Sequence, residues 1–180
     1  MTTLPATPDR QPDLDLVMGE RGTARRCYCM YWRRPDGGFG DDRDNRDRFA
    51  DVLEADRAPG LIGYLEEEPV GWVQVAPRSE FPTTWRSPLV KPEDDDDPWV
   101  INCFVVRAGH RKQGIASGLL AAALAWARDH GARLMEAYPV DGDRTSSVDL
   151  YTGTLGMFEA HGFEVVRRVK ESRPIVRKAL

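Results

Sequence analysis

One short segment, Arg111-Lys112-Gln113-Gly114-Ile115-Ala116, has the residue types and spacing of a phosphate-binding turn. It follows an apolar run, Phe104-Val105-Val106, whose composition predicts a buried strand. A helix that begins near Gly114 would present unpaired backbone N–H groups and the positive end of its dipole. Because glycine has no side chain, a phosphate could approach this backbone closely, and Arg111 and Lys112 add positive charge beside it. The spacing therefore predicts an anion site at a strand-to-helix junction.

The segment matches neither of two familiar phosphate-binding motifs. It lacks the Gly-x-Gly-x-x-Gly of dinucleotide folds and the Gly-Lys-Ser/Thr of nucleoside-triphosphate loops. An ordinary strand-to-helix turn with a basic surface stays open as an alternative, and so does an unrelated nucleotide-binding α/β domain.

The elements that would position this turn follow from the apolar patterns along the chain. Residues 61–66 and 70–76 read as a hairpin around a Glu-Glu-Pro turn. From Gly118 to Ala127 every residue is apolar or glycine, which indicates a helix covered on more than one side. We expect strands over 26–33, 61–66, 70–76, 99–107, 133–138, 163–169 and 175–180, and helices over 41–56, 113–130 and 155–161.

The N-terminal residues differ in composition from the rest of the chain. Pro5, Pro8 and Pro12 lie among polar residues, so we predict a disordered tail over 1–22. Residues 23–180 contain no repeat and no linker that would divide them, which predicts a single domain large enough to bury a core.

The bulk composition excludes several classes of protein. Hydrophobic residues make up 41% of the 180 residues, charged residues make up 30%, and the formal net charge is −4. No basic block suggests nucleic-acid binding, and the longest apolar run is too short to span a bilayer. The N-terminus also lacks a basic-then-apolar signal pattern. We therefore expect a cytoplasmic protein with no nucleic-acid or membrane partner.

A long segment, Pro77 to Pro98, contains five prolines and no periodic pattern. A loop of this length is usually a lid, a binding loop or disordered. It carries an acidic run, Glu93 to Asp97, that is either a solvated surface or a negative field that attracts a cationic amine. We predict that this loop helps to form an acceptor site.

The three cysteines are Cys27, Cys29 and Cys103. An odd number gives no disulfide framework, and a cytosolic setting keeps thiols reduced. The Cys27-x-Cys29 spacing is narrower than that of usual zinc sites, and no second Cys or His pair follows at metal spacing. We interpret Cys27 and Cys29 as small buried residues on one strand face and expect no metal.

The pattern Arg111-x-x-Gly114-x-Ala116 after an apolar strand resembles the acetyl-coenzyme A signature of the GCN5-related N-acetyltransferase (GNAT) family, Gln/Arg-x-x-Gly-x-Gly/Ala. The segment Met157 to Glu164 is similar to the Tyr-Glu-x-x-Gly-Phe segment of that family. The order of expected elements from about residue 25 also resembles its fold. The resemblance implies an α/β domain with a mixed, mostly antiparallel central sheet, helices on both faces, and a splay between the fourth and fifth strands.

The resemblance also implies how acetyl-CoA, the acyl-donor substrate, would bind. Its pantetheine arm would pair like an added strand with the backbone of Phe104, Val105 and Val106. Its pyrophosphate would lie on the backbone N–H groups at the N-terminus of the helix, and Ser117 would add a hydroxyl. The implied pyrophosphate residues are Arg111, Lys112, Gln113, Gly114, Ile115 and Ala116.

The acid for the leaving thiolate is a point of departure from the family. The usual tyrosine is Phe158 here, and a phenyl ring cannot donate a proton. Tyr151 is our candidate substitute and Tyr138 is the second; the alternative for each is a half-buried packing tyrosine.

The general base must be found among the acids and histidines. An alkyl ammonium, with a pKa of about 10, must lose a proton before it attacks a thioester. Glu136 is the charged residue inside strand 133–138, where a carboxylate must be paired or must border a cleft. We predict Glu136 as the base; an outward orientation or an arginine partner is the alternative. Glu80, Asp97, Asp141 and His161 stay open, and Cys103 is disfavoured as an acyl-carrying nucleophile because a buried thiol is usually inert.

Two functions from different classes remain. The first is an enzyme that transfers an acetyl group from acetyl-CoA to a primary amine of a small molecule or protein by direct attack. The second is a catalytically weak acyl-CoA-binding sensor or regulatory module, which the missing tyrosine favours. The expected partner is an amine-bearing acceptor, and a homodimer is one assembly to expect.

Overall fold

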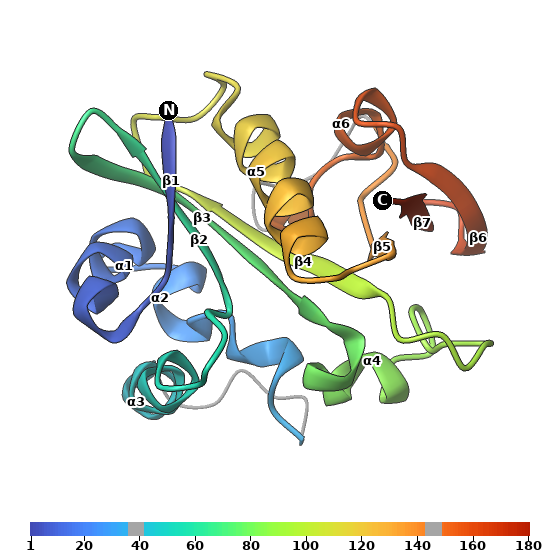
Figure 1. Cartoon of the computed structure of the whole chain (residues 1–180), viewed down its shortest axis with the longest axis horizontal. Helices are drawn as coiled ribbons and strands as arrows, with labels where there is room; N and C mark the ends of the chain where they lie inside the picture. The colour runs from blue at the N-terminus through green and yellow to red at the C-terminus, as the bar shows by residue number, and fades with distance from the viewer. Residues whose placement is uncertain (36–41, 143–148) are drawn as a thin grey trace.

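The computed structural model describes residues 1–35, 42–142 and 149–180. A seven-stranded sheet with the order β1-β2-β3-β4-β5-β7-β6 forms its centre (Figure 1). Neighbouring strands are antiparallel, except that β4 and β5 are parallel. The strands are β1 (Thr2–Pro5), β2 (Gly60–Leu65), β3 (Glu68–Pro77), β4 (Trp99–Val106), β5 (Leu134–Ala137), β6 (Glu164–Lys170) and β7 (Arg173–Ala179). The predicted mixed, mostly antiparallel sheet is confirmed.

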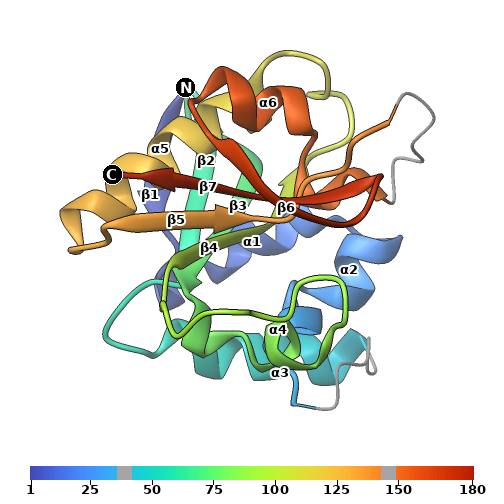
Figure 2. The same ribbon diagram turned by 90° about the vertical axis from the view of Figure 1, so that its right-hand side faces the viewer.

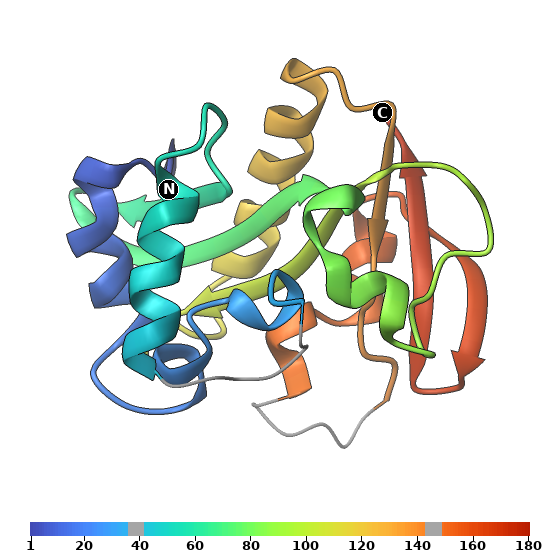
Figure 3. The ribbon, with the colours of Figure 1, turned by 90° about the horizontal axis from the view of Figure 1, so that it is seen from below.

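Helices cover both faces of this sheet. Figure 2 shows α6 on one side and α2, α3 and α4 on the other, and Figure 3 shows α1 and α3 side by side on the face away from α5. None of the helices in the described residues combines the length and apolar character needed to cross a membrane. The helices are α1 (Gln11–Met18), α2 (Thr23–Cys27), α3 (Asp42–Leu53), α4 (Pro82–Arg86), α5 (Ile115–Asp129) and α6 (Leu155–Ala160), with 3₁₀ turns at Pro8–Arg10, Met30–Trp32, Arg78–Glu80 and Asp149–Thr152.

The start of α5 lies close against the sheet. Leu119, Leu120 and Ala123 are fully buried in the core between α5 and the sheet. A Cβ added at Gly71 of β3 would lie only 2.9 Å from Leu119 Cδ1 and 3.0 Å from Ile115 Cγ2. A glycine at this position therefore lets the first turn of α5 approach the sheet beside the end of β4.

The N-terminal segment differs from the expected disordered tail. Residues Thr2 to Pro5 pair with β2 as an edge strand, and α1 buries Leu14, Val17 and Met18 under the sheet. These three apolar residues have the i, i+3, i+4 spacing of one helix face, which outweighs the local proline content. The folded domain therefore includes residues 1–22.

The strand expected over 26–33 is also absent from the structure. The segment forms the end of α2 and the 3₁₀ turn Met30–Trp32, with Tyr28 and Cys29 between them at φ of 48° and 54°. The edge of β2 that this segment could have joined is occupied by β1. Tertiary pairing has thus overridden a composition that favours a strand.

Candidate active site

A cavity of about 1600 Å³ opens between β4, the start of α5, the α1–α2 segment and the turn Asp149–Thr152. Every predicted cofactor-binding residue except Gln113 lines it. Gln113 instead folds back on the turn, where its Nε2 donates to the Gly109 carbonyl at 3.1 Å. The lining residues from the prediction are Phe104, Val105, Val106, Arg111, Lys112, Gly114, Ile115, Ala116 and Ser117.

The edge of β4 that faces this cavity is free of β5. The two strands pair only over Trp99–Ile101 and Met135–Ala137, where β5 ends. Beyond that point β4 continues to Val106 and stays paired with β3 on its other side. The second half of β4 therefore offers backbone groups with which an extended ligand could pair.

The turn before α5 has the backbone of an anion site. Lys112 and Gly114 have φ of 61° and 78°, in the left-handed region that glycine adopts at little cost. Gly118 N–H donates to the Gly114 carbonyl at 3.0 Å, so the amides of Ile115, Ala116 and Ser117 precede the first intrahelical bond. A Cβ added at Gly114 would meet no atom within 4 Å, because the backbone faces open space.

Cationic and polar side chains surround this turn. Arg107, His110, Arg111 and Lys112 all line the cavity. Arg107 Nη1 also donates to Glu68 Oε1 at 2.6 Å in an exposed ion pair. The turn thus combines backbone donors with several positive side chains, which fits a ligand carrying several phosphates.

The Ser117 hydroxyl is held by a residue that the sequence analysis left open as a base. Ser117 Oγ lies 2.8 Å from His161 Nε2, at the end of α6. Ser117 lines the cavity, whereas His161 is not among the lining residues. His161 therefore orients Ser117 at the start of α5.

The opposite end of the cavity is mainly apolar and aromatic. Its wall contains residues of α1 and α2, together with Tyr31, Trp32 and Tyr151. Burial is the main cause that raises the pKa of the Tyr151 phenol. Tyr151 therefore keeps its proton at neutral pH and can act as a hydrogen-bond donor.

Asp15 is an acid in this wall, and its carboxylate is already engaged. Arg46 donates to both carboxylate oxygens, with Nη2 to Oδ2 at 2.7 Å and Nε to Oδ1 at 3.0 Å. Tyr28 donates to Oδ1 at 2.8 Å, and Arg25 does so at 3.2 Å. Burial raises the pKa of Asp15, but the hydrogen bonds from Arg46 and Tyr28 outweigh it, so the net shift is downward. Asp15 is an ionised anchor for the α1–α2 segment.

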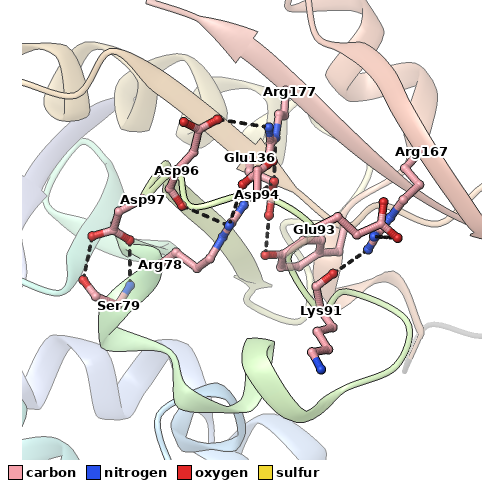
Figure 4. A network of polar contacts seen from close by, with 11 residues as sticks. Arg78, Ser79, Lys91, Glu93, Asp94, Asp96, Asp97, Glu136, Arg167 and Arg177 are labelled. Carbon is pink, nitrogen blue, oxygen red and sulfur yellow. Dashed lines mark hydrogen bonds and ion pairs between the residues drawn. The ribbon is translucent and has the colours of Figure 1, made fainter.

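Glu136 does not line the cavity, and its carboxylate is buried among partners (Figure 4). Its Oε2 accepts from Arg78 Nη2 at 2.6 Å and from Arg177 Nε at 2.7 Å, and Tyr138 donates to Oε1 at 2.7 Å. Arg78 is 0% exposed and Glu136 is 2% exposed. Of the two interpretations left open, the geometry favours a pair with arginine over a general base. Tyr138 is occupied by the same contact and does not line the cavity.

The acidic run is exposed to solvent and partly ion-paired, and it lies outside the cavity. No described residue of 77–98 lines the cavity, which argues against the predicted role of this loop in an acceptor site. Asp94 pairs with Arg78 at 3.3 Å and with Arg177 at 2.6 Å, and Asp97 accepts from Ser79 Oγ at 2.8 Å (Figure 4). The Asp94–Arg177 pair fastens the loop to β7, and Arg78, a residue of the loop itself, ties it to Glu136 of β5.

The remaining candidate bases also lie outside the cavity wall. Glu80 pairs with Arg33 at 2.9 Å and with Arg57, and Asp141 pairs with Arg168 at 2.8 Å. Among the described residues, no three Cys, His, Asp or Glu side chains come together as metal ligands. The α1–α2 wall was not predicted from the sequence, although the spacing of the buried α1 residues is a signal for it.

Comparisons with known proteins were made on the sequence and on the fold. A profile described as "Acetyltransferase (GNAT) family" matches residues 24–157, about three quarters of the chain. No curated protein matched the sequence.

Solved structures share the fold at low sequence identity. A ribosomal-protein-alanine N-acetyltransferase from Brucella melitensis is 17% identical over 100% of both chains, with a TM-score of 0.60. The GNAT domain of S. lividans PAT is 17% identical over 99% of this chain and 89% of its own, with a TM-score of 0.58. The PaiA N-acetyltransferase from Thermoplasma acidophilum, solved in complex with coenzyme A, is 12% identical over 99% and 98%, with a TM-score of 0.52. With the free β4 edge and the turn before α5, the family match establishes that this chain belongs to the GNAT acetyltransferase family.

Proposed function

We propose that this chain is an N-acetyltransferase that moves an acetyl group from acetyl-CoA to a primary amine of a small molecule or protein. One observation carries the proposal: the free edge of β4 and the N-terminus of α5 open into the same cavity as the α1–α2 segment. A strand edge suits the amide-bearing arm of CoA, and a helix N-terminus suits its pyrophosphate. Family membership supports the same donor.

In this proposal, three groups of residues hold the donor. The backbone of Phe104, Val105 and Val106 pairs with the pantetheine arm. The amides from Arg111 to Ala116 and the Ser117 hydroxyl hold the pyrophosphate. The positive side chains at the turn, Arg107, Arg111 and Lys112, neutralise the phosphate charges.

The acceptor then enters from the α1–α2 side, where Tyr31, Trp32 and Tyr151 line the wall. The ammonium loses its proton to water in the open cavity, and the amine nitrogen attacks the thioester carbonyl carbon. The carbon–sulfur bond breaks, CoA leaves as a thiolate that takes up a proton, and the acylated nitrogen releases its second proton to water to give the neutral amide. Tyr151 is our candidate donor of the thiolate's proton, because its phenol lines the cavity, and it then regains a proton from water.

The class of acceptor is kept broad. One structural neighbour is named for the alanine of a ribosomal protein, so both protein N-termini and small amines belong in a substrate panel. We place the reaction in the cytoplasm, where the three free thiols would stay reduced.

The test is calorimetric binding of CoA to the wild type, Gly114→Asp and Gly114→Asn. Both side chains tolerate the left-handed φ at this position, but only Asp adds a negative charge where the pyrophosphate should lie. We expect the Asp variant to bind at least about tenfold more weakly, which is about 1.4 kcal/mol, and the Asn variant to lose less. Equal affinity in all three folded proteins would show that the site lies elsewhere.

A thiol-release assay with the amine panel separates the enzyme from the sensor. Release of free CoA that depends on an amine supports the transferase. Tight binding of acetyl-CoA without release for any amine would favour an acyl-CoA-binding module, in keeping with the buried Phe158 at the usual tyrosine position.

A further inference from the structure

All three cysteines of the chain line the cavity. They are Cys27, Cys29 and Cys103, and each is a free thiol. The Sγ atoms of Cys29 and Cys103 are only 3.0 Å apart, although the two residues are 74 positions apart in the chain. Both side chains are otherwise buried, with residue exposures of 2% and 5%. A small oxidant in the cavity can therefore reach this pair without unfolding of the protein.

The backbone that delivers Cys29 to this position is unusual. Tyr28 and Cys29 are consecutive non-glycine residues with left-handed φ, a conformation that is uncommon outside glycine. Surrounding contacts hold it in place: Tyr28 donates to Asp15 at 2.8 Å, and Gln74 Nε2 donates to the Cys29 carbonyl at 3.3 Å. Strain that neighbouring groups maintain in this way tends to occur at functional positions.

The hydrogen bonds give the two sulfurs different roles. Trp72 Nε1–H, which can only donate, lies 3.2 Å from Cys29 Sγ, so Cys29 is the acceptor. The thiol of Cys103 is the second group beside the same sulfur. The hydrogen bond to Cys29 and burial both raise the pKa of Cys103, which therefore stays protonated as a donor. Two donors thus converge on Cys29 Sγ, and this geometry assigns Cys29 as the attacking sulfur and Cys103 as its partner.

We propose that Cys29 and Cys103 form a reversible disulfide when the protein meets hydrogen peroxide. The Cys29 sulfur attacks a peroxide oxygen, the oxygen–oxygen bond breaks, and a sulfenic acid forms on Cys29 while the released hydroxide takes the thiol proton and leaves as water. The Cys103 sulfur then attacks Cys29 Sγ, the sulfur–oxygen bond breaks, and a second water leaves with the thiol proton. In total, two thiols lose two protons and two electrons, and the peroxide is reduced to water. The sulfurs need to approach by about 1 Å, since a disulfide bond measures about 2.05 Å.

This bond would join the connection after α2 to β4 across the cavity wall. Cys103 lines the cavity and directly precedes Phe104, the first of the three β4 residues that we propose to pair with the pantetheine arm. We expect the bond to hinder acceptor entry and to lower turnover, and this consequence rests on the proposed function. Formation of the bond does not rest on it and can be measured without any substrate.

The test begins with reduced full-length protein exposed to hydrogen peroxide. The remaining thiols are alkylated, and the protein is digested and analysed by mass spectrometry. We expect a peptide pair linked through Cys29 and Cys103, a loss of two hydrogens from the intact protein, an alkylated Cys27, and full reversal by dithiothreitol. Cys27→Ser is the matched control and should form the same link.

Two further variants test the assigned roles. Cys103→Ser should leave a sulfenic acid on Cys29 that dimedone traps, whereas Cys29→Ser should leave Cys103 unoxidised. Folding of each variant is checked by circular dichroism, and Cys103→Ala or Cys29→Ala replaces the serine variant at the same position if that variant does not fold. Alkylation of all three cysteines in oxidised, folded wild type, or a link that includes Cys27, would overturn the proposal.

A separate experiment tests whether the disulfide lowers turnover. Amine-dependent CoA release is measured before oxidation, after oxidation, and after reduction. A loss that dithiothreitol restores, absent in Cys103→Ser, supports the consequence for turnover, and unchanged release with the disulfide formed would overturn it. Absence of release in the reduced protein would count against the proposed function, while the mapped disulfide would still stand.

Discussion

Replacement of Glu136 by glutamine separates a structural role from a catalytic one. Glu136 lies 2.6 Å from Arg78 Nη2, and both side chains are buried. The variant removes the negative charge but keeps the shape and one acceptor oxygen. Arg78 also keeps its contacts with Asp94 and with the Asp96 carbonyl. We therefore expect a loss of about 3 kcal/mol in the free energy of unfolding, at the lower end for a broken buried ion pair.

A loss of this size is easy to measure in a chain of this length. It corresponds to a decrease in Tm of about 6–12 °C, from about 2–4 °C per kcal/mol for proteins of 150–250 residues. Thermal unfolding gives the change in Tm, and urea unfolding gives the change in the free energy of unfolding independently. The matched control is Glu93→Gln, whose carboxylate pairs with Arg167 but is 74% exposed. An exposed pair contributes at most about 1 kcal/mol, so this variant should unfold close to the wild type.

Kinetics on the same variant supply the refutation. If Glu136 is structural, Glu136→Gln should retain turnover and the acidic limb of the pH–rate profile at temperatures where it is folded. An unchanged Tm together with turnover reduced roughly 100-fold and a lost acidic limb would show that Glu136 is the base after all.

Three further predictions concern the cavity and the N-terminal segment. Tyr151→Phe should lower turnover roughly 100-fold with little change in CoA affinity, measured by the thiol-release assay and calorimetry; full activity would mean that Tyr151 is not the acid. Since the pKa of Asp15 is lowered in the folded protein, its contribution to stability is present above about pH 4 and is lost as the pH falls further. In urea unfolding at several pH values, the free energy of unfolding of Asp15→Asn should therefore decrease less with falling pH than that of the wild type. The same pH dependence in both proteins would contradict this. Leu14→Ala, at a fully buried site in α1, should cost about 2–5 kcal/mol in urea unfolding, whereas Leu16→Ala at a half-exposed site should cost far less; equal small effects would mean that α1 adds little to the fold.

The strand-to-helix turn before α5 could be predicted because its signals are local. An apolar run, Gly114 and the adjacent cations lie within one continuous segment, and φ of 78° at Gly114 explains why glycine stands there. The apolar pattern of α5 and the hairpin of β2 and β3 also depend on neighbours in sequence, so their periodicity was sufficient.

The remaining features depend on contacts between distant segments. Glu136 looked like a base because its partners, Arg78 and Arg177, lie 58 and 41 positions away in the chain. Cys29 and Cys103 meet only because β4 and the end of α2 face the same cavity.

From the sequence alone, the α/β class, the order of the central elements and the glycine turn before α5 could be determined, since local spacing specifies them. The tertiary structure alone decided that β1 takes the edge of β2, that 26–33 does not form a strand, and which acids are paired. The physical reason is that strand edges and buried charges are satisfied by whichever partner the whole fold brings within reach.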